Sequence, residues 1–166
     1  MKKRCGPALL VLLLSASAAF AGVSVTHAPS ADFSNYRTYD WETGTPARRP
    51  ATQDWIVAAV DRCLEAGGFH KTESTPDFYV ATHALVDEHT IEELSRPERW
   101  EFLTGVSSVD AYDLGAGTLV VDVLDATTGA VVWRGVATAT VNGSAKKVEK
   151  KVEKRIRKLL ERFPPG

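Results

Sequence analysis

Two runs of alternating side chains, joined by a short turn, constrain the fold of this chain more than any other feature. The first run covers residues 117–125, the second covers residues 130–141, and the glycine-containing segment Thr127-Thr128-Gly129 separates them. In the first run Leu119, Val121 and Val123 alternate with Val120, Asp122 and Leu124. This pattern predicts an antiparallel hairpin, and we expect its two strands to lie at the centre of a sheet.

Two other segments carry apolar residues at helical spacing. Residues 52–66 form the first, and Gly67-Gly68 supplies a stop signal after it. Its apolar residues are Ile56, Ala59, Val60, Cys63 and Leu64. The second helix is predicted to begin after Ser144, which can cap it, and to end at Pro164-Pro165. Its apolar residues are Val148, Val152, Ile156, Leu159, Leu160 and Phe163.

Shorter elements are predicted in the remaining segments. Strands are expected at 23–25, within 33–41, at 69–71 and within 77–86, with a loop at 43–50. Two capping-box spacings predict one or two helical turns within 92–103, which would bury Trp100 and Leu103. Because runs of strands separate the two helices, we expect an α+β fold, a single-domain two-layer sandwich. Its sheet is largely antiparallel, and both helices pack on one face.

The first 21 residues have the pattern of a cleaved secretory signal. Lys2, Lys3 and Arg4 form a basic start, an apolar run follows, and Ala19-Phe20-Ala21 ends the segment with small residues around one aromatic. We therefore expect export to the periplasm and one mature domain over residues 22–166, with no transmembrane span. Cys5 precedes the apolar run, which argues against a lipid-anchored cysteine. Cys63 would then be the only cysteine, so no intrachain disulfide is expected.

Charge is distributed unevenly along the chain. The 166 residues carry a formal net charge of −1, which removes a global electrostatic reason to bind nucleic acid. Residues 144–166 carry nine basic and three acidic side chains, a net +6, whereas residues 22–143 carry eight basic and eighteen acidic ones, a net −10. The expected mature domain is therefore a charge dipole with its basic part on the second helix.

The most unusual motif is a lysine column on that second helix. Lys146, Lys150, Lys154 and Lys158 recur every four residues, flanked by Lys147, Lys151 and Arg155. Like charges at this spacing destabilise a helix, so stability alone does not favour the pattern. The candidate binding residues are Lys147, Lys150, Lys151, Lys154 and Lys158. They could dock anionic lipid head groups, lipopolysaccharide or an acidic protein surface, or mediate head-to-tail self-association, and the alternative is a solvated outer face.

A weaker candidate is a metal cluster. His83, Asp87 and His89 would project to one side of a continuous strand, although the sequence offers no fourth ligand. The alternative for His83 is an ordinary packed or edge histidine. His27 and His70 are expected at surface or edge positions, and Cys63 is expected to pack as a small hydrophobe. No cofactor is predicted.

Paired carboxylates are a further weak candidate. Asp122 and Asp125 lie in or beside the hairpin and could serve in acid–base chemistry. We expect instead that Asp125 starts the turn and that Asp122 faces solvent. Trp133 and Arg134 should point to opposite faces of their strand, with Trp133 in the core. The sequence contains no nucleophile-elbow, paired-cysteine or zinc-protease motif.

Several stretches together resemble a known family. They are Phe33-x-x-Tyr-x-Thr-Tyr-x-Trp41, Pro76-Asp77-Phe78, Tyr112 with the run from Gly117 to Asp125, Thr128 to Ala137, and the terminal Phe163-Pro-Pro. In these the chain resembles the bacterial envelope family catalogued as domain of unknown function 4136. The resemblance implies an exported α+β domain, and it implies neither a reaction nor catalytic residues. Many members look like lipoproteins, whereas this chain has no cysteine after its signal.

These observations favour a periplasmic binding or interaction domain of unknown biochemical role that docks to an envelope component. That component would be an anionic lipid, lipopolysaccharide or a protein. A small-ligand or lipid carrier, and an uncharacterised hydrolase or metal-dependent enzyme, are the alternatives that the sequence leaves open. Whether the chain is an enzyme is left open, with the motifs favouring a non-enzymatic role.

Overall fold

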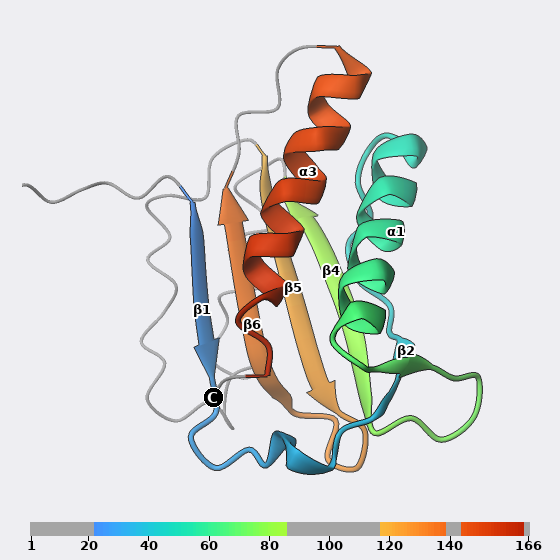
Figure 1. The fold of residues 1–166 in the computed structure, drawn as a ribbon, viewed down its shortest axis with the longest axis vertical. Coiled ribbons are helices and arrows are strands. Elements are labelled where there is room, and N and C mark those ends of the chain that lie inside the picture. The colour runs from blue at the N-terminus through green and yellow to red at the C-terminus, as the bar shows by residue number, and fades with distance from the viewer. Residues whose placement is uncertain (1–21, 86–116, 139–143, 165–166) are drawn as a thin grey trace, which may run out of the picture.

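The fold is an open sheet covered on one face by two helices (Figure 1). The computed structural model describes residues 22–85, 117–138 and 144–164. Its strands are β1 (Val23–His27), β2 (Thr38–Trp41), β3 (His70–Lys71), β4 (Phe78–Leu85), β5 (Thr118–Asp125) and β6 (Val131–Thr138). Its helices are the short 3-10 helix η1 (Phe33–Asn35), α1 (Pro50–Ala66) and α3 (Ala145–Leu160).

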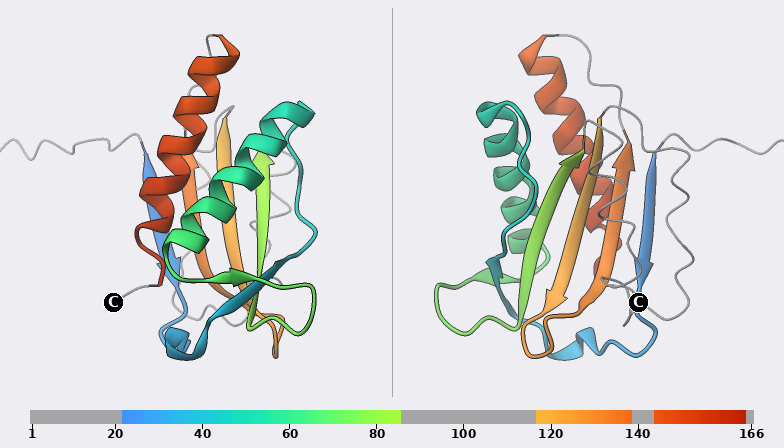
Figure 2. Two further views of the ribbon diagram at one scale, coloured as in Figure 1. Left: turned by 45° about the vertical axis from the view of Figure 1, so that its right-hand side comes forward. Right: turned by 180° about the vertical axis from the view of Figure 1, so that it is seen from behind.

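The strands lie side by side in the order β1-β6-β5-β4-β2-β3. All pairings from β1 to β4 are antiparallel, and β2 runs parallel to both β4 and β3. The two α-helices, α1 and α3, lie on the same face of the sheet, as the two views in Figure 2 show. The expected α+β class, with a largely antiparallel sheet and two helices on one face, is confirmed.

The predicted hairpin is the centre of the sheet. β5 and β6 pair antiparallel with Asp122 opposite Arg134, and the register shifts between Val123 and Leu124. The turn glycine, Gly129, has a φ of 70°, a conformation that side chains disfavour. β4 pairs with the other edge of β5 along its whole length.

Local sequence signals explain where the helices begin and end. α1 starts at Pro50, whose fixed φ suits a first helical position, and stops at Gly67, whose amide donates to the Cys63 carbonyl. Ser144 occupies the N-cap of α3, as predicted, although its side chain makes no capping hydrogen bond. α3 ends at Leu160, so Phe163 reaches the core from the segment after the helix rather than from the helix itself.

Other predictions are refined or fall outside the described residues. The segment 33–41, expected as a strand, begins with the 3-10 helix η1 because Asp32 accepts a hydrogen bond from the Ser34 amide. The signal segment 1–21, the predicted turns at 92–103 and the end of the second hairpin strand beyond 138 lie outside the described residues.

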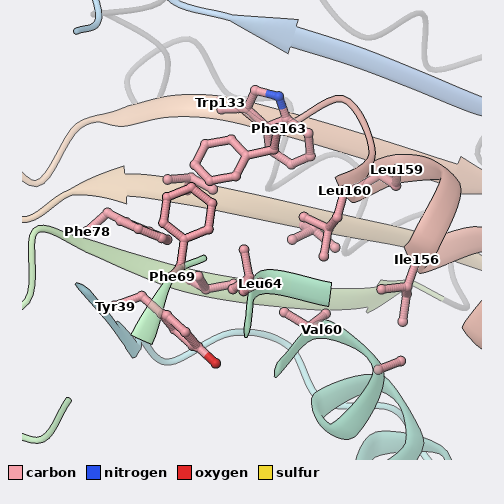
Figure 3. Close-up of a cluster of buried hydrophobic side chains, with 14 of the residues drawn as sticks. Tyr39, Val60, Leu64, Phe69, Phe78, Trp133, Ile156, Leu159, Leu160 and Phe163 are labelled. Atoms are coloured by element: carbon pink, nitrogen blue, oxygen red, sulfur yellow. The ribbon is translucent and has the colours of Figure 1, made fainter. Parts of the chain in front are cut away.

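The core lies between the sheet and the helices (Figure 3). The ring of Phe78 stacks on those of Tyr36 and Tyr39, with centroid distances of 5.2 Å and 5.8 Å. The ring centroids of Phe163 and Trp133 are 5.3 Å apart. The core side of α3 contributes Ile156, Leu159 and Leu160, all buried. The apolar side of α3 is therefore buried against the sheet. Only its opposite side is exposed.

Candidate functional site

The outward side of α3 carries the charge predicted from the sequence. We call six residues, all exposed, the lysine face: Lys146, Lys147, Lys150, Lys151, Lys154 and Lys158. They include all five candidate binding residues. With a rise of about 1.5 Å per residue, the four lysines spaced by four residues span about 18 Å. Figure 1 shows that α3 begins beyond the ends of the strands, so its first turn extends past the sheet.

The acidic residues of α3 lie on its flank toward α1. Glu153 pairs with Arg62 of α1, with 3.1 Å between nitrogen and oxygen, and Glu149 lies one turn earlier on the same side. Glu161 lies 4.0 Å from Arg157. The first turn of α3 contains no acidic residue, although a helix N-terminus favours one. The exposed side of α3 therefore carries more basic than acidic side chains, and its stacked lysines cost the helix some stability.

A second constellation lies on the sheet face opposite the helices. The Arg134 guanidinium binds both carboxylate oxygens of Asp122, with Nε–Oδ1 and Nη2–Oδ2 distances of 2.5 Å. His83 Nε2 lies 3.5 Å from Asp122 Oδ2. On the other side of the ring, His83 Nδ1 lies 3.1 Å from Thr45 Oγ1 and 3.2 Å from the Thr45 amide nitrogen. We call Thr45, His83, Asp122 and Arg134 the His83 cluster.

The hydrogen-bond roles within the His83 cluster follow from its donors. The Thr45 amide can only donate, so Nδ1 of His83 accepts and Nε2 carries the proton that faces Asp122. Burial alone would raise the pKa of Asp122. The bond from His83 and the charge and bonds of Arg134 outweigh it and hold that pKa below its ordinary value. Asp122 is therefore a charged acceptor at neutral pH rather than an acid that could donate a proton.

Three of the four side chains of the His83 cluster are buried, and Thr45 is half-buried. His83 is 6% exposed, Asp122 2% and Arg134 5%. A buried carboxylate held at two points by arginine links β5 to β6, which is a structural role. The expectation that Asp122 faces solvent is wrong, because the face of the sheet to which it belongs is also buried.

The remaining candidates are the proposed metal residues and the pair of carboxylates, Asp122 and Asp125. Of the proposed metal residues the structure describes His83, whereas Asp87 and His89 lie outside the described residues. Within the described ranges, no three or more metal-ligating side chains come together. Asp125 begins the turn, accepting hydrogen bonds from the amides of Thr127 and Thr128. As predicted, it is a turn residue and not a partner for Asp122.

Three further predictions concern single side chains. Trp133 is fully buried on the helix side while Arg134 lies on the other face, as expected. Its indole Nε1 has no hydrogen-bond partner within the part of the chain that the structure describes. His27 and His70 are exposed on the two edge strands, and Cys63 is half-buried against the core. Burial raises the pKa of the Cys63 thiol, which lowers its reactivity.

Sequence reasoning missed the His83 cluster. Counting outward from the predicted turn would set Asp122 opposite Trp133, and the register shift between Val123 and Leu124 is what brings it opposite Arg134. No local signal exists for Thr45 either. It reaches His83 through an isolated parallel bridge from a segment read as a loop.

Comparisons with known proteins agree with the fold. A family model described as Domain of unknown function (DUF4136) matches residues 23–165. No curated protein matches the chain. A crystal structure of a DUF4136 family protein from Bacteroides thetaiotaomicron is similar, with a TM-score of 0.62, 14% identity, and coverage of 87% of this chain and 96% of that chain.

Two other solved structures are similar in fold. A PDZ domain protein from Parabacteroides distasonis aligns with a TM-score of 0.58 and 14% identity, over 87% of this chain but 35% of its own. The PelC dodecamer from Paraburkholderia phytofirmans aligns with a TM-score of 0.50 and 15% identity, over 83% of this chain and 93% of its own. Among the described helices none is long and apolar enough to cross a membrane.

Proposed function

The chain belongs to the family described as Domain of unknown function (DUF4136), and from that premise we propose that it is an exported envelope domain that docks to anionic lipid head groups through the lysine face. The observation that carries the proposal is the exposure of all six lysines on one side of α3. The acidic residues of the helix lie on its flank toward α1 or are paired within the helix.

The packing of α3 favours surface contact over insertion. An amphipathic helix that enters a bilayer needs a free apolar side, whereas Ile156, Leu159 and Leu160 are buried in the core. What remains is electrostatic attraction, worth about 1 kcal/mol for each lysine near an anionic surface. Salt shortens the reach of that attraction to about 8 Å at physiological ionic strength. Docking is therefore reversible and salt-sensitive.

The sequence of residues 1–21 supports export. Removal of a signal after Ala21 would leave Gly22 as the first residue, directly before β1. We propose a periplasmic location on this basis. Intact-mass measurement of protein recovered from the periplasm tests it, because the mass of residues 22–166 is expected, and the mass of the full chain in the cytoplasmic fraction would contradict it.

Vesicle binding tests the docking proposal. Purified domain is mixed with vesicles of phosphatidylglycerol and phosphatidylcholine, or of phosphatidylcholine alone, and the bound fraction is measured by co-sedimentation. Binding is expected only with phosphatidylglycerol and should fall as salt is raised. Equal binding to both vesicle types, or none to either, would reject lipid docking.

Head-to-tail self-association is a second candidate, favoured by charge at the opposite end of the domain. Asp125 accepts a hydrogen bond from Tyr36 Oη, and Asp32 and Asp77 lie close enough to help raise the Tyr36 pKa. This acidic group lies at the end of the sheet away from the start of α3 (Figure 1). The similar PelC structure is a dodecamer. Salt-sensitive oligomers in sedimentation velocity, without lipid, would select this candidate over lipid docking.

A further inference from the structure

The outer edge of β1 has the backbone geometry of a strand acceptor. The Thr138 amide donates to the Gly22 carbonyl, and the Ala28 amide donates to the Val132 carbonyl. In an antiparallel pair the residues that bond inward alternate with residues that bond outward. With the register of β1 and β6, the N–H and C=O groups of Val23, Val25 and His27 therefore point away from β6.

Among the described residues, the protection of this edge is limited to one arginine, Arg162. β1 ends the strand order of the described sheet, and its sequence Val-Ser-Val-Thr-His contains neither proline nor a formally charged side chain. Edge strands are normally blunted by charges, prolines, bulges or shortness. The opposite edge strand, β3, is only two residues long. The two edge strands thus differ in length, and β1 is the one long enough to pair with another strand.

Charge beside β1 selects the partner. Arg162 donates from Nη1 to the Val23 carbonyl at 3.3 Å, which places a guanidinium directly on the outer edge. A second copy of this chain, paired antiparallel through β1, would place its own Arg162 at the far end of the shared edge, which adds positive charge without adding a partner for this guanidinium. An acidic strand would instead meet opposite charge.

We propose that the outer edge of β1 binds an extended acidic peptide segment of a partner protein, which adds to the sheet as a seventh strand. Backbone hydrogen bonds to the Val23 amide and to the amides and carbonyls of Val25 and His27 supply the affinity, and an acidic side chain beside Arg162 supplies the selectivity. This site is separate from the lysine face, so its test is independent of lipid docking.

The probe is a capped peptide of sequence Thr-Glu-Val-Glu-Val-Glu-Thr, compared with the same peptide carrying Lys for Glu. Binding is followed by NMR of the ¹⁵N-labelled domain. The glutamate peptide should slow hydrogen exchange at the amides of Val23, Val25 and His27. The lysine peptide should bind at least about tenfold more weakly, because it sets like charges together.

Two variants separate strand addition from loss of the fold. Val25→Pro removes an outward N–H while leaving the bonds to β6 intact, so the domain should stay folded and lose peptide binding. Val25→Thr keeps that N–H and should bind like the wild type. Unchanged binding by a folded Val25→Pro domain, equal binding of both peptides, or binding of neither would overturn the proposal. Dimers of the wild type that Val25→Pro abolishes would also overturn it, since the occupant would then be a second copy.

Discussion

Asp122 on β5 and Arg134 on β6 face each other across the central pair of strands and form a two-point ion pair that is almost completely buried. His83 approaches the same carboxylate from β4, so one aspartate connects three neighbouring strands. A buried carboxylate is tolerated here because both its oxygens have charged or polar partners.

Removing one member of this pair should destabilise the domain strongly. Asp122→Ala leaves the Arg134 guanidinium buried without its carboxylate, and the free energy of unfolding should fall by about 3–5 kcal/mol. Urea denaturation followed by circular dichroism measures the change. The double variant Asp122→Leu with Arg134→Met removes both charges and should recover most of the loss. A double variant no more stable than Asp122→Ala would show that the pair is not the dominant interaction at this site.

Acid should weaken the same interaction. The pKa of Asp122 is lowered in the folded state, so its contribution to stability is present above the unfolded-state pKa of about 3.9 and disappears as pH falls through the lower folded-state value. The urea midpoint of the wild type should therefore drop between pH 5 and pH 2 by more than that of the Asp122→Leu, Arg134→Met double variant. The comparison is needed because Asp77 and Asp125 also have lowered pKa values. Parallel losses in both proteins would contradict the assignment to Asp122.

Gly44 should be indispensable for placing Thr45 beside His83. A Cβ added at Gly44 would lie 2.1 Å from the backbone oxygen of Thr82, and the backbone cannot easily yield. Gly44→Ala should cost about 1–3 kcal/mol of unfolding free energy, as overpacking does. It should also change the ring ¹⁵N shifts of His83 by moving Thr45. Gly67→Ala is the matched control: its nearest contact would be 3.3 Å and its φ of −78° suits alanine. Similar losses in the two variants would argue against a special role for Gly44.

Gly135 should set how closely α3 approaches the sheet. A Cβ at this position would meet Leu159 Cδ2 at 2.3 Å and Trp133 Cη2 at 2.7 Å. Gly135→Ala is expected to lower the free energy of unfolding by about 1–3 kcal/mol. Leu159→Ala creates space at the same point, so the double variant should be more stable than the sum of the two single losses predicts. Thermal unfolding of all four proteins forms the cycle, and strict additivity would show that the two sites do not compete for space.

The sequence predicted the elements better than the environments of their residues. Periodicity located α1 and α3, since each buries one regular set of apolar positions, and the β5–β6 hairpin was located by its alternating runs on either side of a glycine-containing turn. Periodicity misjudged Asp122 because alternation identifies two faces without saying whether the second is solvated. Val120 and Leu124, which share the parity of Asp122, were the sign that the second face is apolar too. The Thr45–His83 contact depends on tertiary pairing of a loop with β4, which no local pattern encodes.

The most direct test of the docking account neutralises the lysine face without altering the core. Lys147, Lys150, Lys151 and Lys154 are changed together to Gln, and a matched variant changes the same four residues to Arg. Affinity for phosphatidylglycerol vesicles is then measured at low and physiological salt. The account predicts that the Gln variant loses binding at both salt concentrations while the Arg variant binds like the wild type. Undiminished binding by a folded Gln variant would contradict it.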